Sequence, residues 1–295
     1  MSAVLHEIRA QARDIGFPVR RLLPSAKAQS VGPFVFLDHM GPARFEAGST
    51  VSDVRPHPHI GLATVTYLFS GAMMHRDGLG SVQRIEPGAV NLMTAGRGIV
   101  HSERIPSDVR DEGAAVEGIQ MWVALPLAEE GCEPAFCHYS EEVLPRWRDG
   151  GADVHLLIGE MLGRRSPVAV KSETLYAALS LDAGGSFTVP AAAPERALYV
   201  AEGDITLDGV QVAPQTLLVL VPGATPVLQA NSAARLMLLG GAPLDGDDKG
   251  GGRRLMWWNF VASRRELIED AKADWQAGRF VPVPGETEFI PLPER

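Results

Sequence analysis

Two short motifs hold the residues of this sequence that are best suited to metal chemistry. The first is Arg55-Pro-His-Pro-His, which places His57 and His59 just before an apolar stretch with strand character. Side chains at positions i and i+2 of an extended chain point to the same face, so both imidazoles can reach one ion. The two intervening prolines favour extended backbone and reduce the freedom that is lost on metal binding.

The second motif repeats this spacing with His101 and Glu103 in Val100-His-Ser-Glu, after a glycine turn at 95–98. If the two extended segments lie side by side, three imidazoles and one carboxylate meet at one point. Such a donor set suits Fe, Mn, Co, Ni, Cu or Zn, whereas Mg or Ca would prefer more oxygen ligands. On an octahedral ion, four protein ligands leave two positions for water, substrate or dioxygen.

The remaining histidines are expected to have simpler roles. His75, in Met74-His-Arg-Asp, is a candidate for a group behind the metal ligands, although a surface histidine is the more common alternative. Ordinary structural roles are expected for His6, His39, His138 and His155. Cys132 and Cys137 are expected to be plain thiols, which excludes a disulfide framework and favours a reducing cytoplasm.

Composition excludes several classes of protein. The 295 residues carry a net charge of −9, which argues against nucleic acid as the main partner. No apolar run is long enough to span a membrane, and the N-terminus lacks the apolar core of a signal peptide. A hydrophobic content of 45% is typical of globular proteins, so we expect a globular cytoplasmic protein.

Apolar and β-branched stretches bounded by glycine or proline predict a protein built almost entirely from strands. The expected strands are Ala63–Phe69, Ala89–Met93, Ile119–Leu125, Val154–Ile158, Ala197–Ala201, Leu217–Val221 and Ala234–Leu239. Their spacing, with little helix between them, favours sandwiches or barrels. A weak internal duplication, YLFSG at 67–71 and YVAEG at 199–203, indicates two related β units in tandem.

Three other segments complete the expected organisation. The polar segment 128–151 is interpreted as a linker, and 246–252 as a flexible loop. Near the end, the spacing of Ser263 and Glu266 predicts a capping box. The helix that follows is expected to bury Leu267, Ile268, Ala271 and Trp275 and to end at Gly278, before an extended proline-rich tail that lies over a surface.

The sequence resembles the pirin family of the cupin superfamily over nearly its whole length. The most specific motifs are FVFLDHMG at 34–41, HPHIGLATVTYLFSG at 57–71, HRDG at 75–78, Pro87-Gly88, MTAGRGIVHSE at 93–103, QMWV at 120–123 and WWNF at 257–260. The resemblance implies an all-β bicupin, in which two antiparallel β-barrels are followed by a C-terminal helix.

The resemblance also implies how the chain is divided and where the metal binds. Residues 1–135 would form a metal-binding cupin domain, 136–245 a degenerate metal-free one, and 246–295 a helix and tail that pack on the barrels. The implied ligands are His57, His59, His101 and Glu103, with iron as the usual metal. One departure concerns Ala63, since the general cupin pattern has glutamate there; Glu103 must supply the carboxylate, or the site has three histidines and water.

The resemblance also implies an enzymatic activity, which the residues alone do not identify. Bacterial pirin-like proteins are associated with quercetin 2,3-dioxygenase activity, which implies a flavonol-like substrate, dioxygen and Glu103 as the catalytic base. The alternatives are a redox-sensing regulator that acts through protein contacts, modulation of a metabolic enzyme by such a contact, and a different metal-dependent reaction.

Overall fold

The computed structural model describes residues 2–50, 53–246 and 252–294. Contacts within the chain divide it into two compact units, and each unit is formed by separate stretches of sequence. The unit that we call the histidine unit comprises residues 13–19, 40–139 and 244–295, and the companion unit comprises 1–12, 20–39 and 140–243. Within the described residues, no helix is both long and apolar enough to cross a membrane.

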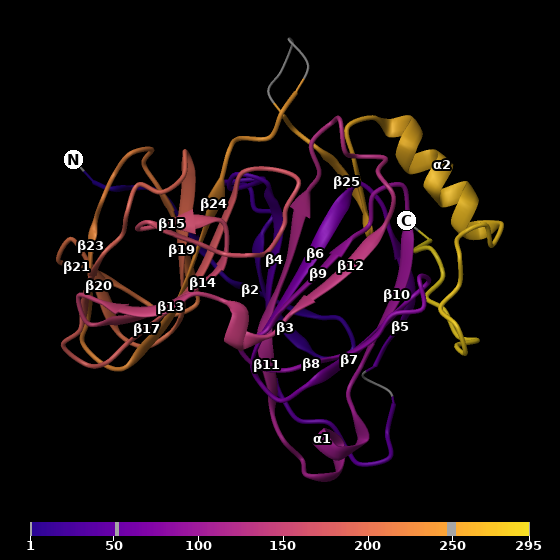
Figure 1. Cartoon of the computed structure of the whole chain (residues 1–295), viewed down its shortest axis with the longest axis horizontal. Coiled ribbons are helices and arrows are strands. Elements are labelled where there is room, and N and C mark those ends of the chain that lie inside the picture. Colours follow the sequence, from indigo (N-terminus) through magenta and orange to yellow (C-terminus); the bar gives the residue numbers. More distant parts are fainter. Residues whose placement is uncertain (1, 51–52, 247–251, 295) are drawn as a thin grey trace. The chain divides into compact units, whose positions relative to one another are not determined.

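The histidine unit is organised around two antiparallel sheets (Figure 1). The larger has the order β12-β9-β6-β11-β4-β3-β2. Its strands are β2 (Gln11–Asp14), β3 (Pro18–Leu23), β4 (Phe34–Ala43), β6 (Leu62–Ser70), β9 (Val90–Thr94), β11 (Val116–Ala124) and β12 (Ala135–Tyr139). Residues 11–12 of β2, 20–23 of β3 and 34–39 of β4 are grouped with the companion unit. The smaller has the order β5-β10-β7-β8, with β5 (Val54–His59), β7 (Met73–Asp77), β8 (Val82–Ile85) and β10 (Ile99–Arg104). The unit also contains the short helix α1 (Ser107–Asp111).

The companion unit repeats this plan. Its larger sheet has the order β1-β22-β19-β24-β17-β14-β13, with β1 (Val4–Arg9), β13 (Arg146–Asp149), β14 (Ala152–Ile158), β17 (Thr174–Leu181), β19 (Glu195–Glu202), β22 (Thr216–Leu220) and β24 (Ala234–Gly241). Its smaller sheet has the order β18-β23-β20-β21, with β18 (Ser186–Thr188), β20 (Ile205–Leu207), β21 (Val210–Val212) and β23 (Val227–Ala230). A separate hairpin pairs β15 (Glu160–Met161) with β16 (Arg164–Arg165).

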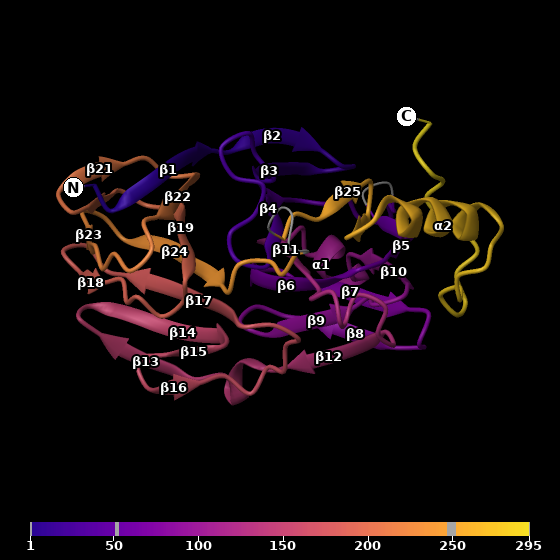
Figure 2. The same ribbon diagram turned by 90° about the horizontal axis from the view of Figure 1, so that it is seen from above.

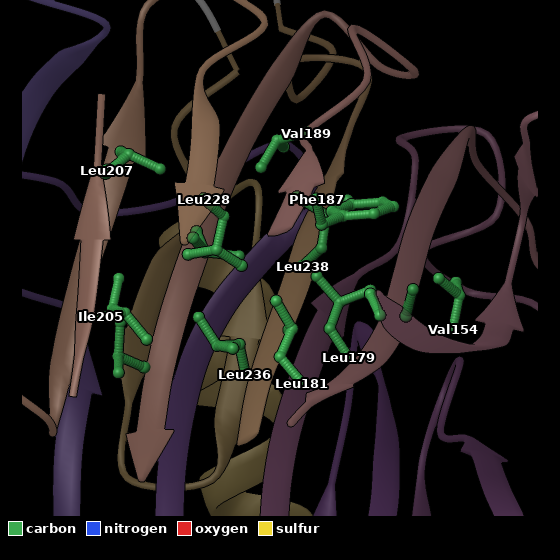
Figure 3. Close-up of a cluster of buried hydrophobic side chains, with 14 of the residues drawn as sticks. Val154, Leu179, Leu181, Phe187, Val189, Ile205, Leu207, Leu228, Leu236 and Leu238 are labelled. Carbon is green, nitrogen blue, oxygen red and sulfur yellow. The ribbon is translucent and has the colours of Figure 1, made fainter. Parts of the chain in front are cut away.

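The core of the companion unit lies between its two sheets. Leu179 and Leu238 from the larger sheet gather with Phe187, Ile205 and Leu228 from the smaller one, and all are buried (Figure 3). Alternation along each strand sends every second side chain inward, which gives each sheet one apolar face.

The strands expected from the sequence are confirmed, with boundary differences of up to three residues. The linker prediction for 128–151 is wrong, because this segment contains β12, the single-turn helix η1 (Glu141–Val143) and β13. β12 pairs with β9, and β13 pairs with β14. Both strands lie at sheet edges and have no buried residue, so neither needs the apolar alternation that marks an interior strand.

The C-terminal helix is confirmed as α2 (Arg265–Gln276), but its expected capping box is wrong. The N-cap is Arg264, without a side-chain cap, and the Ser263 hydroxyl instead donates a hydrogen bond to Glu130, at 2.7 Å. Gly278 has a φ of +66°, the left-handed conformation that suits the residue after a helix C-cap. The expected apolar face packs against β26 (Phe260–Ala262), which forms a hairpin with β25 (Leu255–Trp257).

The tail after α2 lies beside β5 and β10, as expected (Figures 1 and 2). Residues 279–294 contain no helix or strand, and the Ile290 N–H donates to the Pro56 carbonyl on β5 at 2.8 Å. The predicted loop at 246–252 lies mostly outside the described residues. The division into three contiguous domains stays a prediction. By their contacts, the tail groups with the histidine unit, and 1–12 and 20–39 group with the companion unit.

Candidate metal centre

The register of the smaller sheet of the histidine unit gathers the predicted site residues on one face. β10 lies between β5 and β7, and His101 is the cross-strand partner of both His57 and Asp77. Glu103, two residues further along β10, is the partner of His75. Since paired residues in antiparallel strands place their side chains on the same side, the i, i+2 spacing of the sequence becomes a cluster in space.

Three of the predicted ligands are in direct proximity. The ligand atoms of His57, His59 and His101 all lie within 4.8 Å of one another, and the three side chains are buried. His59 Nε2 and His101 Nε2 are 3.1 Å apart. Among the described residues, no second group of three histidine, cysteine or carboxylate side chains brings its ligand atoms this close.

Hydrogen bonds fix which nitrogen of two imidazoles faces the centre. His57 Nδ1 is 2.9 Å from the Arg55 carbonyl oxygen, and His59 Nδ1 is 3.1 Å from the Asn259 carbonyl oxygen. A carbonyl only accepts, so each Nδ1 must carry the proton and each Nε2 must keep its lone pair. Such partners orient metal-binding histidines in proteins generally.

The Asn259 carbonyl reaches His59 because a C-terminal hairpin packs against the end of β5. Asn259 lies in the turn between β25 and β26, and Ile60 forms a bridge with Phe260. Gly61 allows this approach: it has a φ of +67°, and a methyl group at its Cα would overlap the Val261 carbonyl oxygen. The WWNF motif at 257–260 therefore supplies a backbone acceptor to the site, a role that could not be assigned from sequence.

The electrostatics of the cluster favour neutral imidazoles. Burial lowers the pKa of His57 to about 4, against the hydrogen bond to Arg55, which raises it. Burial also lowers the pKa values of His59 and His101 well below their ordinary range, and the neighbouring histidines lower them further. Neutral imidazoles whose lone pairs face one another are the form that a divalent transition metal requires, so the residues present fit such an ion.

Glu103 is buried near the three histidines, but its carboxylate is not among the ligand atoms that lie within 4.8 Å of one another. The β5–β10 register shifts between His101 and Glu103, which moves the carboxylate relative to β5. Gln120 Nε2 donates to Glu103 Oε1 at 3.4 Å, and the Thr66 hydroxyl donates to Gln120 Oε1 at 2.7 Å. Burial raises the pKa of Glu103 to about 7, and the Gln120 hydrogen bond opposes that rise.

His75 is a buried residue, so the surface alternative is wrong. Its Nδ1 lies 3.4 Å from His101 Nδ1, and its Nε2 lies 2.9 Å from Asp77 Oδ2. The ring stacks on Phe136, with centroids 4.1 Å apart. Burial alone would raise the pKa of Asp77, but hydrogen bonds from His75 and Ser81 outweigh it and lower that pKa. The sequence signal for this pair is the His-x-Asp spacing on one strand face.

The other histidines lie elsewhere. His39 Nδ1 is 2.7 Å from the Tyr199 hydroxyl in the companion unit, where His155 is also buried. His138 Nδ1 lies 2.8 Å from Asn91 Oδ1, between β12 and β9. His6 lies on β1 of the companion unit.

A cavity of about 540 Å³ lies on the opposite face of the β5–β10 pair from the histidines, between α2 and the tail. Pro56 and Val100, which precede His57 and His101, line it together with Trp275, Phe280 and Phe289. Alternation along the strands explains this separation, because neighbours in sequence point to opposite faces.

Two units of antiparallel sheets, with histidines clustered on the inner face of one of them, define a bicupin. Comparison with known families agrees: residues 16–123 match the Pirin family model, and residues 176–281 match the model of the Pirin C-terminal cupin domain. The chain belongs to the pirin family.

Its relatives include pirin-like proteins and proteins that carry the name quercetin 2,3-dioxygenase. It is 46% identical to a pirin-like protein of Caulobacter vibrioides, over 97% of this chain and 98% of that one. It is 40% identical to a protein of Pseudomonas aeruginosa that carries quercetin 2,3-dioxygenase as a provisional name, over 93% and 84%. A crystal structure of quercetin 2,3-dioxygenase from Acinetobacter baumannii matches with a TM-score of 0.88 and 32% identity, over 99% and 97%.

Proposed function

We propose that the chain is a metal-dependent dioxygenase of the quercetin 2,3-dioxygenase type, acting on flavonol-like substrates with dioxygen. The observation that carries this proposal is the convergence of one ring nitrogen from each of three buried histidines within 4.8 Å, with the buried Glu103 carboxylate beside them. We assign His57, His59 and His101 as ligands and Glu103 as the fourth ligand and the base. The names of the relatives support the choice of substrate class.

Iron(II) is the metal that we propose, and Mn, Ni, Co, Cu or Zn would suit the same donors. When bound, a divalent ion in this site would act as a Lewis acid that lowers the pKa of a substrate hydroxyl and orients the substrate. We propose that the companion unit is metal-free and that one ion binds per chain.

The residues around the centre would handle the proton. Glu103 is positioned to accept the proton of the flavonol 3-hydroxyl, since its Oε1 is held only by the long Gln120 hydrogen bond of 3.4 Å among the contacts described. Gln120, fixed in turn by Thr66, keeps the carboxylate turned toward the interior. The reaction consumes one dioxygen per flavonol and yields one depside and one carbon monoxide, so the substrate is oxidised as dioxygen is reduced.

A matched substitution tests the base. Glu103→Gln keeps the shape of the side chain and removes its ability to take a proton. We expect metal to be retained with about tenfold weaker affinity and quercetin turnover to fall by at least about 100-fold. Quercetin absorbance and carbon monoxide release, measured on iron-loaded samples of known metal content, report the two effects separately.

Two results would contradict the proposal. Full turnover in Glu103→Gln would remove the proposed base. Iron-loaded wild-type protein that releases no carbon monoxide from quercetin would contradict the substrate and the reaction, and would favour the redox-sensing alternative for the same site.

A further inference from the structure

A hydrogen-bonded chain leads away from the proposed metal centre through His101. His101 Nδ1 lies 3.4 Å from His75 Nδ1, and His75 Nε2 lies 2.9 Å from Asp77 Oδ2. Both His75 and Asp77 are buried, with 3% and 0% of their surface exposed. The proposed mechanism uses neither residue.

Asp77, the residue of this hydrogen-bonded series farthest from the metal centre, acts as an acceptor. Asp77 Oδ1 accepts hydrogen bonds from the backbone N–H groups of Leu79, at 2.9 Å, and Ser81, at 3.0 Å. These bonds hold the carboxylate in the turn that follows β7 and leave Oδ2 facing His75. Because an ionised carboxylate only accepts, the shared proton must reside on His75 Nε2.

The position of this proton on His75 determines whether His75 Nδ1 can accept a hydrogen bond from His101. A neutral His75 with its proton on Nε2 keeps a lone pair on Nδ1, which faces His101 Nδ1. To bind the proposed ion through Nε2, His101 must carry its proton on Nδ1, so His101 Nδ1 must be the donor and His75 Nδ1 the acceptor. His101 Nε2 then keeps its own lone pair and directs it toward the centre, 3.1 Å from His59 Nε2.

His101 therefore differs from the other two proposed ligands. His57 and His59 donate to backbone carbonyls, which are acceptors whatever happens around them. An imidazole accepts at Nδ1 in only one of its neutral tautomers. His75 Nδ1 can therefore accept the His101 hydrogen bond only while Asp77 keeps the proton of His75 on Nε2. Stacking on Phe136, with an angle of 9° between the rings, keeps the His75 ring in this plane.

We propose that His75 and Asp77 are positioning residues that hold His101 in its metal-binding tautomer. The inference rests on the metal site proposed above. It assigns to Asp77, which is the cross-strand partner of His101 and is hydrogen-bonded to His75, control over which nitrogen of His101 is free.

Asp77→Asn is the sharpest test. The Leu79 and Ser81 N–H groups would keep the amide oxygen at the Oδ1 position, so the amide NH₂ would face His75. His75 would then accept at Nε2 and donate from Nδ1, and the His101 proton would move to Nε2, where it blocks the lone pair. We expect the dissociation constant for Co(II), measured by visible absorption at pH 7.5, to rise by about 10- to 100-fold.

A pair of substitutions at position 75 gives an independent test. The carbonyl of Gln in His75→Gln can accept from His101 Nδ1, so Co(II) affinity should stay within about threefold of the wild type. His75→Phe preserves stacking on Phe136 but offers no acceptor, so its affinity should fall as in Asp77→Asn. Adding Asp77→Asn to His75→Phe should cause no further loss, whereas two merely structural roles would add.

His59→Ala separates this inference from the metal site itself. If His59→Ala loses Co(II) while Asp77→Asn and His75→Phe bind it as the wild type does, the positioning role is overturned and the site stands. If His59→Ala binds Co(II) normally, the site is overturned and the positioning role with it. Should Asp77→Asn fail to fold, equal affinities of His75→Gln and His75→Phe would by themselves overturn the inference.

Discussion

At the scale of single residues, the protons of the three clustered histidines decide what the site can bind. The spacing of His57, His59 and His101 predicted from sequence alone that their imidazoles converge, because residues at i and i+2 of a strand place their side chains on the same face of the sheet. The acceptors that set their tautomers could not be predicted in the same way. The Asn259 carbonyl lies 200 positions from His59 in sequence, and every residue type offers the same carbonyl.

The lowered pKa values of the histidines predict how metal-free protein responds to acid. His57 has a folded-state pKa of about 4 against an ordinary value of 6.5, so the unfolded chain binds the proton first. Stability is fully present above pH 6.5 and is lost as the pH falls toward 4. Between pH 7 and pH 5, His57 alone should lower the free energy of unfolding by about 2 kcal/mol, measured by urea denaturation after metal removal.

The variant His57→Gln provides the comparison for this prediction. Carboxylates titrate alike in both proteins, so their contributions cancel in the difference. Removing His57 also removes its lowering effect on the pKa values of His59 and His101, which makes the variant less sensitive to acid still. The variant should therefore lose at least about 2 kcal/mol less than the wild type over the same interval. Parallel pH curves for the two proteins would show that His57 is not held neutral in the fold.

At the scale of elements, the long apolar strands of the larger sheets were predictable because their composition and alternation mark them directly. β6 and β24 are rich in β-branched and leucine residues and fall where the sequence placed them. β12 was missed because an edge strand with alternating exposure carries little apolar signal. Its position matters for the site, since β12 supplies the Phe136 ring beneath His75.

The contact between β5 and the C-terminal hairpin gives a prediction at this scale. A methyl group at Gly61 would overlap the Val261 backbone, and this backbone cannot give way as a flexible side chain would. Gly61→Ala should push the hairpin away, withdraw the Asn259 carbonyl from His59 and lower the free energy of unfolding by about 3 kcal/mol or more. Denaturation and Co(II) binding should both report the change.

Gly209, in the turn between β20 and β21 of the companion unit, is the matched position for this substitution. It also has a positive φ, of +78°, but open space surrounds the place where a Cβ would lie. Gly209→Ala should therefore cost only the backbone strain, about 1 kcal/mol, and leave Co(II) affinity unchanged. Equal effects of the two substitutions would show that the hairpin contact does not support the site.

At the scale of the whole molecule, the two-barrel architecture was predictable from the sequence. Resemblance and internal duplication indicated two tandem β units, and the two family models match along the chain in that order. The units themselves exchange segments: β1 pairs with β22 in the companion unit, and the C-terminal tail joins the histidine unit. Pairing between strands so distant in sequence depends on packing that local composition does not encode.

The two units also differ in chemistry despite their common plan. Within the described residues, the histidine cluster has no counterpart in the companion unit, where His155 lies buried in β14 among apolar strands. The proposal of one ion per chain follows from this asymmetry. With one site per chain, replacing a single ligand histidine should remove all of the bound metal, whereas replacing any other histidine should remove none.

Elemental analysis of iron-supplied wild type, His59→Ala and His155→Ala tests the central claim most directly. The account predicts about one equivalent of metal per chain in the wild type and in His155→Ala, and almost none in His59→Ala. His138→Ala, from a histidine bonded only to Asn91 among the contacts described, should match the wild type as a second control. Equal metal content in His59→Ala and the wild type would contradict the account.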